Sequence, residues 1–84
     1  MLVVDDDAVA FSLIERLATE MGFIVVREMD GRAALAALPS LRPDGAIVDV
    51  GLSDIDGLRM LREIQAVDPQ SQVILMTEDR KSVV

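Results

Sequence analysis

Hydrophobic and polar positions follow two patterns along the chain, and each pattern predicts a different kind of element. Runs of consecutive apolar residues are typical of strands buried on both faces, and they predict four strands over residues 1–4, 23–27, 45–50 and 72–77. Apolar residues spaced three and four apart predict helices over residues 8–21, 31–38 and 57–67. The last residues, EDRKSVV, read as a turn and the start of one more helix.

Helix boundaries are marked by residues with known preferences. Asp7 and Asp30 stand where an N-cap is needed, because their side chains can accept from the first free amides of a helix. Gly22 stands where a glycine ends a helix, and the segment from Pro39 is expected to end the second one.

Two of the predicted helices have apolar residues on one side. The first helix places these residues on one stripe: Phe11, Ile14, Leu17, Ala18 and Met21. The third helix places three residues at core spacing, Leu58, Leu61 and Ile64, and Arg59, Arg62 and Glu63 on a solvated face.

Strands that alternate with helices, each strand apolar throughout, indicate an α/β fold: a doubly wound parallel sheet with helices on both faces. The 84 residues contain no linker or repeat, so a single small domain is expected. In such sheets, ligands bind beyond the carboxyl ends of the strands.

Composition narrows the function classes. The net charge is −7 and the only aromatic residues are two Phe, so direct nucleic-acid binding is not expected. Cys and His are both absent, which excludes disulfides and thiolate or imidazole metal sites. The chain shows no membrane-length apolar run and no signal peptide, so the expected location is the cytoplasm, away from any membrane.

Polar residues gather where the predicted strands end. Asp5, Asp6 and Asp7 follow the first strand, Asp49 lies near the end of the third, and Thr77 closes the fourth. If the first and third strands are neighbours, about 4.8 Å apart, then Asp5, Asp6 and Asp49 meet in one crevice.

Such crowding of carboxylates is costly. Two of them 4 Å apart repel by about 4 kcal/mol at an effective dielectric constant of 20. A cation is the simplest remedy, and oxygen ligands without His or Cys suit Mg²⁺, which also accepts phosphate oxygens. The sequence therefore predicts a magnesium site.

Three stretches resemble the receiver domain of two-component response regulators: LVVDDDAVAFSLIERLATEMGF, AIVDVGLSDIDGLRMLREI and VILMT. The resemblance rests on the acidic pair after the first strand, on Asp49 with Asp56 and Gly57 seven and eight residues later, and on Thr77. It implies a flavodoxin-like sheet of strand order 2-1-3-4.

The resemblance also implies a role for each site residue. Asp49 is the phosphoacceptor, and it receives the phosphoryl group from a sensor histidine kinase or a phosphotransfer protein. Asp6 ligates Mg²⁺ directly, Asp5 ligates it through water, and the Gly51 backbone carbonyl is a further ligand. Thr77 is the switch hydroxyl. The expected function is to switch a protein-interaction surface in a phosphorelay, without an enzymatic activity of its own.

The chain departs from the family pattern at its C-terminal end. The family has five strands and a last helix, whereas residues 1–84 supply four strands and so constitute a truncated receiver. The fifth strand carries a Lys that pairs with the phosphoryl group, and Lys81 falls too early to be assigned that role. The bare sheet edge and face lead us to expect a fragment of a longer regulator or a homodimer.

Other interpretations remain open. Asp7 is expected to be a helix cap rather than a ligand, and Asp56 to shape the turn before Gly57. A degenerate receiver that binds partners without phosphorylation is the main alternative function. A Mg²⁺-dependent phosphohydrolase is a third, but its D-x-D-x-T/V pattern after the first strand is absent.

Overall fold

The computed structural model describes residues 1–52 and 54–76. These residues form four strands and three helices that alternate along the chain. In order they are β1 (Leu2–Val4), α1 (Ala8–Glu20), β2 (Val26–Glu28), α2 (Gly31–Leu41), β3 (Gly45–Asp49), α3 (Gly57–Val67) and β4 (Gln72–Met76). No helix in the described ranges is long and apolar enough to cross a membrane.

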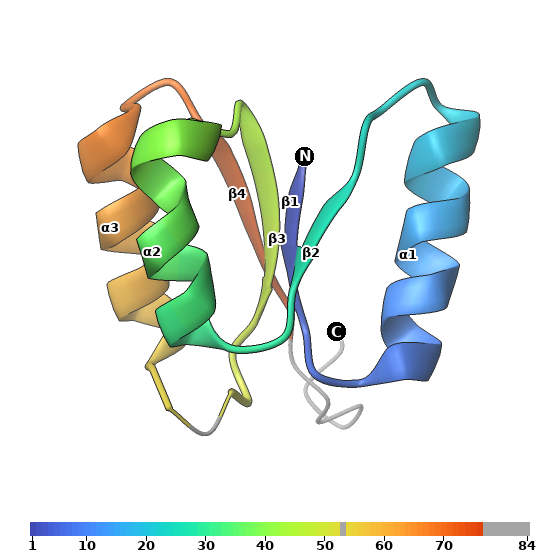
Figure 1. Cartoon of the computed structure of the whole chain (residues 1–84), viewed down its shortest axis with the longest axis horizontal. Helices are drawn as coiled ribbons and strands as arrows, with labels where there is room; N and C mark the ends of the chain where they lie inside the picture. The colour runs from blue at the N-terminus through green and yellow to red at the C-terminus, as the bar shows by residue number, and fades with distance from the viewer. Residues whose placement is uncertain (53, 77–84) are drawn as a thin grey trace, which may run out of the picture.

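The four strands form one parallel sheet of order β2-β1-β3-β4. Figure 1 shows α2 and α3 on one face of this sheet and α1 on the other. The predicted fold class and strand order are therefore confirmed. The carboxyl ends of β1 and β3 lie at the same edge of the sheet, the lower edge in Figure 1, where the loops to α1 and α3 begin.

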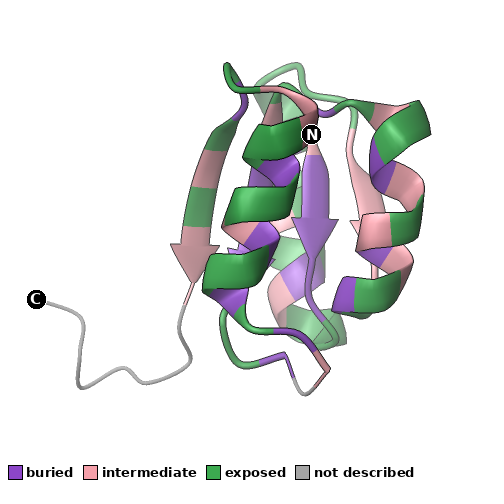
Figure 2. Ribbon diagram, turned by 90° about the vertical axis from the view of Figure 1, so that its left-hand side faces the viewer, coloured by how far each residue is buried: buried purple, intermediate pink, exposed green. Residues whose placement is uncertain are grey.

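The core lies between the sheet and the pair of helices α2 and α3. Strand β1 is fully buried, as its apolar run predicts, and is purple throughout in Figure 2. β4, at the edge, alternates between exposed and partly buried positions. The buried apolar residues of this core are Leu2, Val4, Ala34, Leu38, Ala46, Val48, Leu52, Ile55, Met60 and Ile64.

Strand β2 begins three residues later than the sequence predicts. The Phe23 amide donates to the Ala18 carbonyl and the Gly22 amide to the Thr19 carbonyl, so these residues close the end of α1. Gly22 has a φ of 93°, which confirms its predicted role in ending the helix. β1 is three residues long, and only Val26–Glu28 lie opposite it.

Helix α2 passes through Pro39, contrary to the prediction that it ends there. Proline removes one hydrogen bond from a helix. The helix nevertheless continues because Leu38 and Leu41 pack against the core on either side of Pro39. It ends at Arg42, which has a φ of 42° and whose amide donates to the Leu38 carbonyl.

Two predictions about helix faces are wrong in part. On α3, Leu58 is 53% exposed, and Met60 occupies the core position instead, together with Ile64. On α1, Phe11 and Ala18 are buried, whereas Leu17 and Met21 are more than half exposed. Within the described part of the chain, α1 is alone on its face of the sheet, so its apolar stripe is only partly covered.

Candidate functional site

Three carboxylates meet where β1 and β3 end. The strands are paired in register with Val4 opposite Val48, which brings the next residues, Asp5 and Asp49, side by side. Oxygens of Asp5, Asp6 and Asp49 all lie within 4.8 Å of one another. Asp5 and Asp49 are buried and Asp6 is exposed. The predicted convergence of these three side chains is confirmed.

The Asp5 carboxylate is held by the start of the next helix. Its Oδ1 accepts a hydrogen bond of 2.9 Å from the Asp7 amide. Burial raises the pKa of the Asp5 carboxyl, the bond from Asp7 opposes that rise, and the charge of Asp49 adds to it. Ionisation of Asp5 is thus harder than that of a free aspartate, and a cation beside it would offset this effect.

The Asp49 carboxylate is fixed by the turn that follows β3. Its Oδ1 accepts a hydrogen bond of 2.8 Å from the Gly51 amide. A Cβ atom on Gly51 would stand 3.2 Å from the same oxygen, closer than such contacts normally are. A glycine therefore suits this position, which places the Gly51 main chain beside the carboxylates.

The donor set of the cluster is suited to a hard divalent cation. It consists of carboxylate oxygens, and the sequence contains no Cys or His. The only ion pair among the described side chains joins Arg16 to Glu20 on α1, away from the cluster. Carboxylate oxygens, with room for water on the exposed side of Asp6, are the kind of ligands that Mg²⁺ prefers.

Arg27 is a neighbour of the site that the sequence did not reveal. Its Nε and Nη2 lie 3.4 Å from the Asp5 carbonyl oxygen, and its guanidinium carbon is 4.5 Å from the centre of the Phe11 ring. Arg27 thereby links β2, the acidic turn and α1. An arginine within a strand gives no signal of this role in the sequence, because the contact depends on the register of β2 against β1.

Two other acidic residues of these loops, Asp7 and Asp56, are helix caps. Asp7 is the N-cap of α1 and accepts from the Val9 and Ala10 amides, as predicted. Asp56 is the N-cap of α3 and accepts from the Leu58 amide. These bonds occupy donors that would otherwise be unpaired at the helix ends.

Two residues of interest lie outside the described residues. Thr77, the expected switch hydroxyl, directly follows the last described residue of β4. Lys81, which was not assigned the role of the fifth-strand lysine, also falls there.

Comparison with known proteins identifies the family. The family model of the response regulator receiver domain matches residues 1–84. The chain belongs to this family.

Relatives of this receiver domain are found in larger proteins. It is 32% identical over 77 residues to the response regulator MprA of Mycolicibacterium vanbaalenii, covering 92% of this chain and 33% of that protein. It is 34% identical over 79 residues to a protein-glutamate methylesterase/protein-glutamine glutaminase of Trichodesmium erythraeum, covering 92% of this chain and 22% of that protein. The chain thus spans a third or less of these relatives.

A solved receiver domain has the same fold. The receiver of the sensor histidine kinase PA1611 from Pseudomonas aeruginosa superposes with a TM-score of 0.80 at 29% identity, covering 93% of this chain and 66% of that one. That structure contains a magnesium ion coordinated in its active site cleft.

Proposed function

We propose that this receiver takes a phosphoryl group onto Asp49 from a sensor histidine kinase or a phosphotransfer protein, with Mg²⁺ bound, and so switches a protein-interaction surface. The observation that carries the proposal is the meeting of Asp5, Asp6 and Asp49 within 4.8 Å. The magnesium ion in the PA1611 receiver supports the same assignment.

In the proposed reaction, Asp49 is the nucleophile. A carboxylate oxygen attacks the phosphorus of a phosphohistidine, an O–P bond forms as the N–P bond breaks, and an acyl phosphate results. The hydrogen bond from the Gly51 amide to Oδ1 holds the carboxylate and leaves the other oxygen for attack. The leaving imidazole retains its electron pair and takes a proton from solvent.

Asp5 and Asp6, with the Gly51 carbonyl, are the proposed ligands that share Mg²⁺ with Asp49. Bound Mg²⁺ would neutralise charge on the carboxylates and on the transferred phosphoryl oxygens. We assign direct ligation to Asp6 and ligation through water to Asp5, whose carboxylate is already engaged by the Asp7 amide.

Thr77 is the proposed switch residue. Its hydroxyl would donate a charge-assisted hydrogen bond to the phosphoryl group on Asp49 and so favour one arrangement of the adjoining surface. The position supports the proposal, because Met76 pairs with Asp49 in the sheet and Thr77 is the next residue.

Phosphorylation by acetyl phosphate and Mg²⁺ tests the assignment of Asp49. Intact-protein mass spectrometry is expected to show the gain of one phosphoryl group in the wild type and none in Asp49→Asn. Asp44→Asn is the matched control, because Asp44 is exposed at the opposite end of β3. A mass gain that persists in Asp49→Asn would overturn the assignment.

A degenerate receiver, which binds partners without phosphorylation, predicts a different result. The wild type would show no mass gain although it is folded and binds Mg²⁺, and partner affinity would be unchanged in Asp49→Ala. The two functions are thus separated by one pair of measurements.

We also propose that the chain forms a homodimer through the edge of β4 or the uncovered sheet face. Within the described residues β4 pairs with β3 alone. An apolar groove on the α1 face is lined by Met1, Ile14, Leu17, Ala18, Met21, Phe23, Ile47 and Ile74. An unpaired edge and a bare apolar patch both favour association.

Light scattering tests the homodimer. The wild type is expected to have the mass of a dimer, and Ile74→Arg, which places a charge on a side chain that is 59% exposed, is expected to be monomeric. A monomeric wild type that remains folded would contradict the proposal.

The proposed function does not include nucleic-acid binding, enzymatic activity or membrane binding. A net charge of −7 argues against direct nucleic-acid binding. We assign the segment a regulatory role in the cytoplasm, without an enzymatic activity of its own and without a membrane partner. One relative is a methylesterase, but the chain matches only 22% of that protein's length, so we do not extend the esterase activity to this chain.

A further inference from the structure

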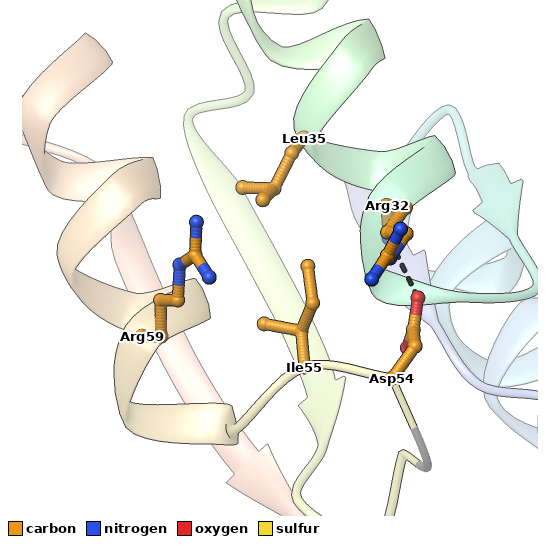
Figure 3. Close-up of a pocket in the computed structure, with 5 residues that line it drawn as sticks. All are labelled: Arg32, Leu35, Asp54, Ile55 and Arg59. Atoms are coloured by element: carbon orange, nitrogen blue, oxygen red, sulfur yellow. Dashed lines mark hydrogen bonds between the residues drawn. The ribbon is translucent and has the colours of Figure 1, made fainter.

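A second concave site lies at the start of α2 and α3, apart from the carboxylate cluster. It is a groove of about 300 Å³ lined by Arg32, Leu35, Asp54, Ile55 and Arg59. Figure 3 shows Leu35 and Ile55 between the two arginines, which come from different helices. None of these residues belongs to the proposed magnesium site, so the groove needs a separate explanation.

Asp54, the acidic residue of the groove, already accepts hydrogen bonds from the main chain of α2. Its two oxygens accept hydrogen bonds of 3.1 and 3.0 Å from the Gly31 and Arg32 amides at the first turn of α2. These amide bonds, the one from Arg32 most of all, lower the pKa of Asp54, which is therefore ionised at neutral pH. Asp54 thus fixes the loop against α2 through main-chain donors.

Neither guanidinium group forms an ion pair within the described ranges, although the charge of Arg32 contributes to the lowered pKa of Asp54. The single ion pair there is between Arg16 and Glu20. The chain has 15 acidic and 8 basic residues, so two arginines at one groove, neither of them in an ion pair among the described residues, stand out against its negative charge. A guanidinium presents a planar fork of donors that matches a carboxylate.

The space between the arginines is apolar. Ile55 is 7% exposed, and Leu35 is partly buried against the core. A ligand that fits both features carries a carboxylate on each side of an aliphatic group. The groove has room for one or two side chains rather than for a folded element.

We propose that this groove binds a short acidic segment of a partner protein in which an aliphatic residue has Asp or Glu two positions away on each side, so that in an extended chain all three side chains point the same way. The carboxylates pair with Arg32 and Arg59, and the aliphatic side chain rests on Leu35 and Ile55. Because the arginines are exposed, the interaction is weak and falls with rising salt concentration. It is independent of phosphorylation at Asp49.

A titration followed by amide NMR tests this proposal on the whole 84-residue chain. The probe is an acetylated and amidated pentapeptide, Glu-Ser-Leu-Ser-Glu, and its Gln-Ser-Leu-Ser-Gln counterpart is the uncharged control. The amides of Arg32, Leu35, Ile55 and Arg59 are expected to shift with the acidic peptide and not with the neutral one.

Substitutions assign the binding to the groove. Arg32→Gln and Arg59→Gln are each expected to weaken the binding of the peptide about threefold to fivefold, the upper range for an exposed ion pair. Arg62→Gln is the matched control, because Arg62 is exposed on the same helix, does not line the groove, and its loss changes the net charge equally. It is expected to leave the affinity within about twofold.

Three outcomes would overturn the proposal. The first is an equal loss of affinity in Arg62→Gln, which would indicate unspecific attraction. The second is a set of shifts outside the groove. The third is binding of inorganic phosphate at the groove without binding of the peptide, which would assign it to small anions. Asp49→Asn is expected to bind the peptide as the wild type does, so failure here is separate from failure of the proposed phosphotransfer.

Discussion

The Arg27 guanidinium donates to the Asp5 carbonyl oxygen from 3.4 Å, so a residue of β2 fastens the turn that carries the acidic cluster. The same group stacks on Phe11 of α1. Three segments far apart in the sequence are thus joined by one side chain. The Asp5 main chain is thus held from β2 by this side chain as well as by the hydrogen bond from its own amide to the Glu28 carbonyl.

Replacing Arg27 is therefore expected to cost stability. Arg27→Gln loses the stacking on Phe11 and the bonds to the Asp5 carbonyl, and should lower the free energy of unfolding by about 1–2 kcal/mol. Urea denaturation measures the loss. Arg16→Gln removes the same charge but only an exposed ion pair of 3.6 Å, and should cost about 0.5 kcal/mol or less. Equal losses in the two variants would show that Arg27 has no special role.

Binding of Mg²⁺ is expected to stabilise the fold. A ligand that binds only the native state adds about 2.7 kcal/mol at a concentration 100 times its dissociation constant. Thermal unfolding with and without Mg²⁺ measures this gain. Asp6→Asn and Asp49→Asn should reduce it, whereas Asp44→Asn, at the far end of β3, should keep it. The metal site would be refuted if Asp44→Asn reduced the gain as much as Asp49→Asn does.

The buried carboxyl of Asp5 is expected to make stability depend on pH when no metal is present. Its pKa is raised in the folded protein, mainly by burial, so the folded state binds the proton more tightly than the unfolded chain does. The resulting stability is fully present below the unfolded pKa of about 4 and is lost as pH rises through the folded pKa.

Asp5→Asn removes this titration. Without Mg²⁺ the variant should therefore gain stability relative to the wild type as pH rises through that window, and with Mg²⁺ the gain should shrink because the wild type is then stabilised. Urea denaturation over a pH series measures both. A difference between variant and wild type that stays constant with pH would contradict the assignment.

Gly57, the first residue of α3, allows the helix to lie close to Val50, the residue that follows β3. A Cβ atom on Gly57 would stand 2.8 Å from Cγ1 and 3.2 Å from Cα of Val50, the residue after Asp49. Gly57→Ala should destabilise the protein by about 1–3 kcal/mol through overpacking. Thermal or urea unfolding measures this cost.

Gly45→Ala is the control for the glycine prediction. Its nearest contact would be the Gln72 carbonyl oxygen at 3.8 Å, an ordinary distance, so the change should stay within about 0.5 kcal/mol. Val50→Ala combined with Gly57→Ala should recover part of the loss, because the Cγ1 contact is then absent. A Gly57→Ala variant as stable as the wild type would show that the loop shifts freely.

Much of this protein can be predicted from its sequence, because its signals are local. The apolar run of β1, the caps at Asp7 and Asp30, and the glycine at the end of α1 each act within a few residues. Asp56 was expected to shape the turn before Gly57, and the structure shows that it does so as the cap of α3. Alternation of strands and helices then predicts the parallel sheet, since each connection must cross to the next strand. The resemblance to receiver domains is confirmed by the family match.

Other features were decided by contacts between distant segments. The start of β2 follows from the three-residue length of β1, and α2 continues past Pro39 because Leu38 and Leu41 pack on the core. On α3 the core positions are Met60, Ile64 and Val67, whose spacing of four and three suits a helix as well as that of Leu58, Leu61 and Ile64 does. The packing of α2 against α3 decided between the two stripes.

The same division holds at the sites. The sequence has three acidic residues after β1 and one at the end of β3. Because these two strands pair in parallel, the acidic residues at their ends must lie close together. Only the tertiary structure showed that Arg27 reaches the Asp5 carbonyl and that Arg32 and Arg59 face one groove. Strand ends converge by a rule of sheet geometry, whereas side chains from separate helices meet only through the packing of the whole fold.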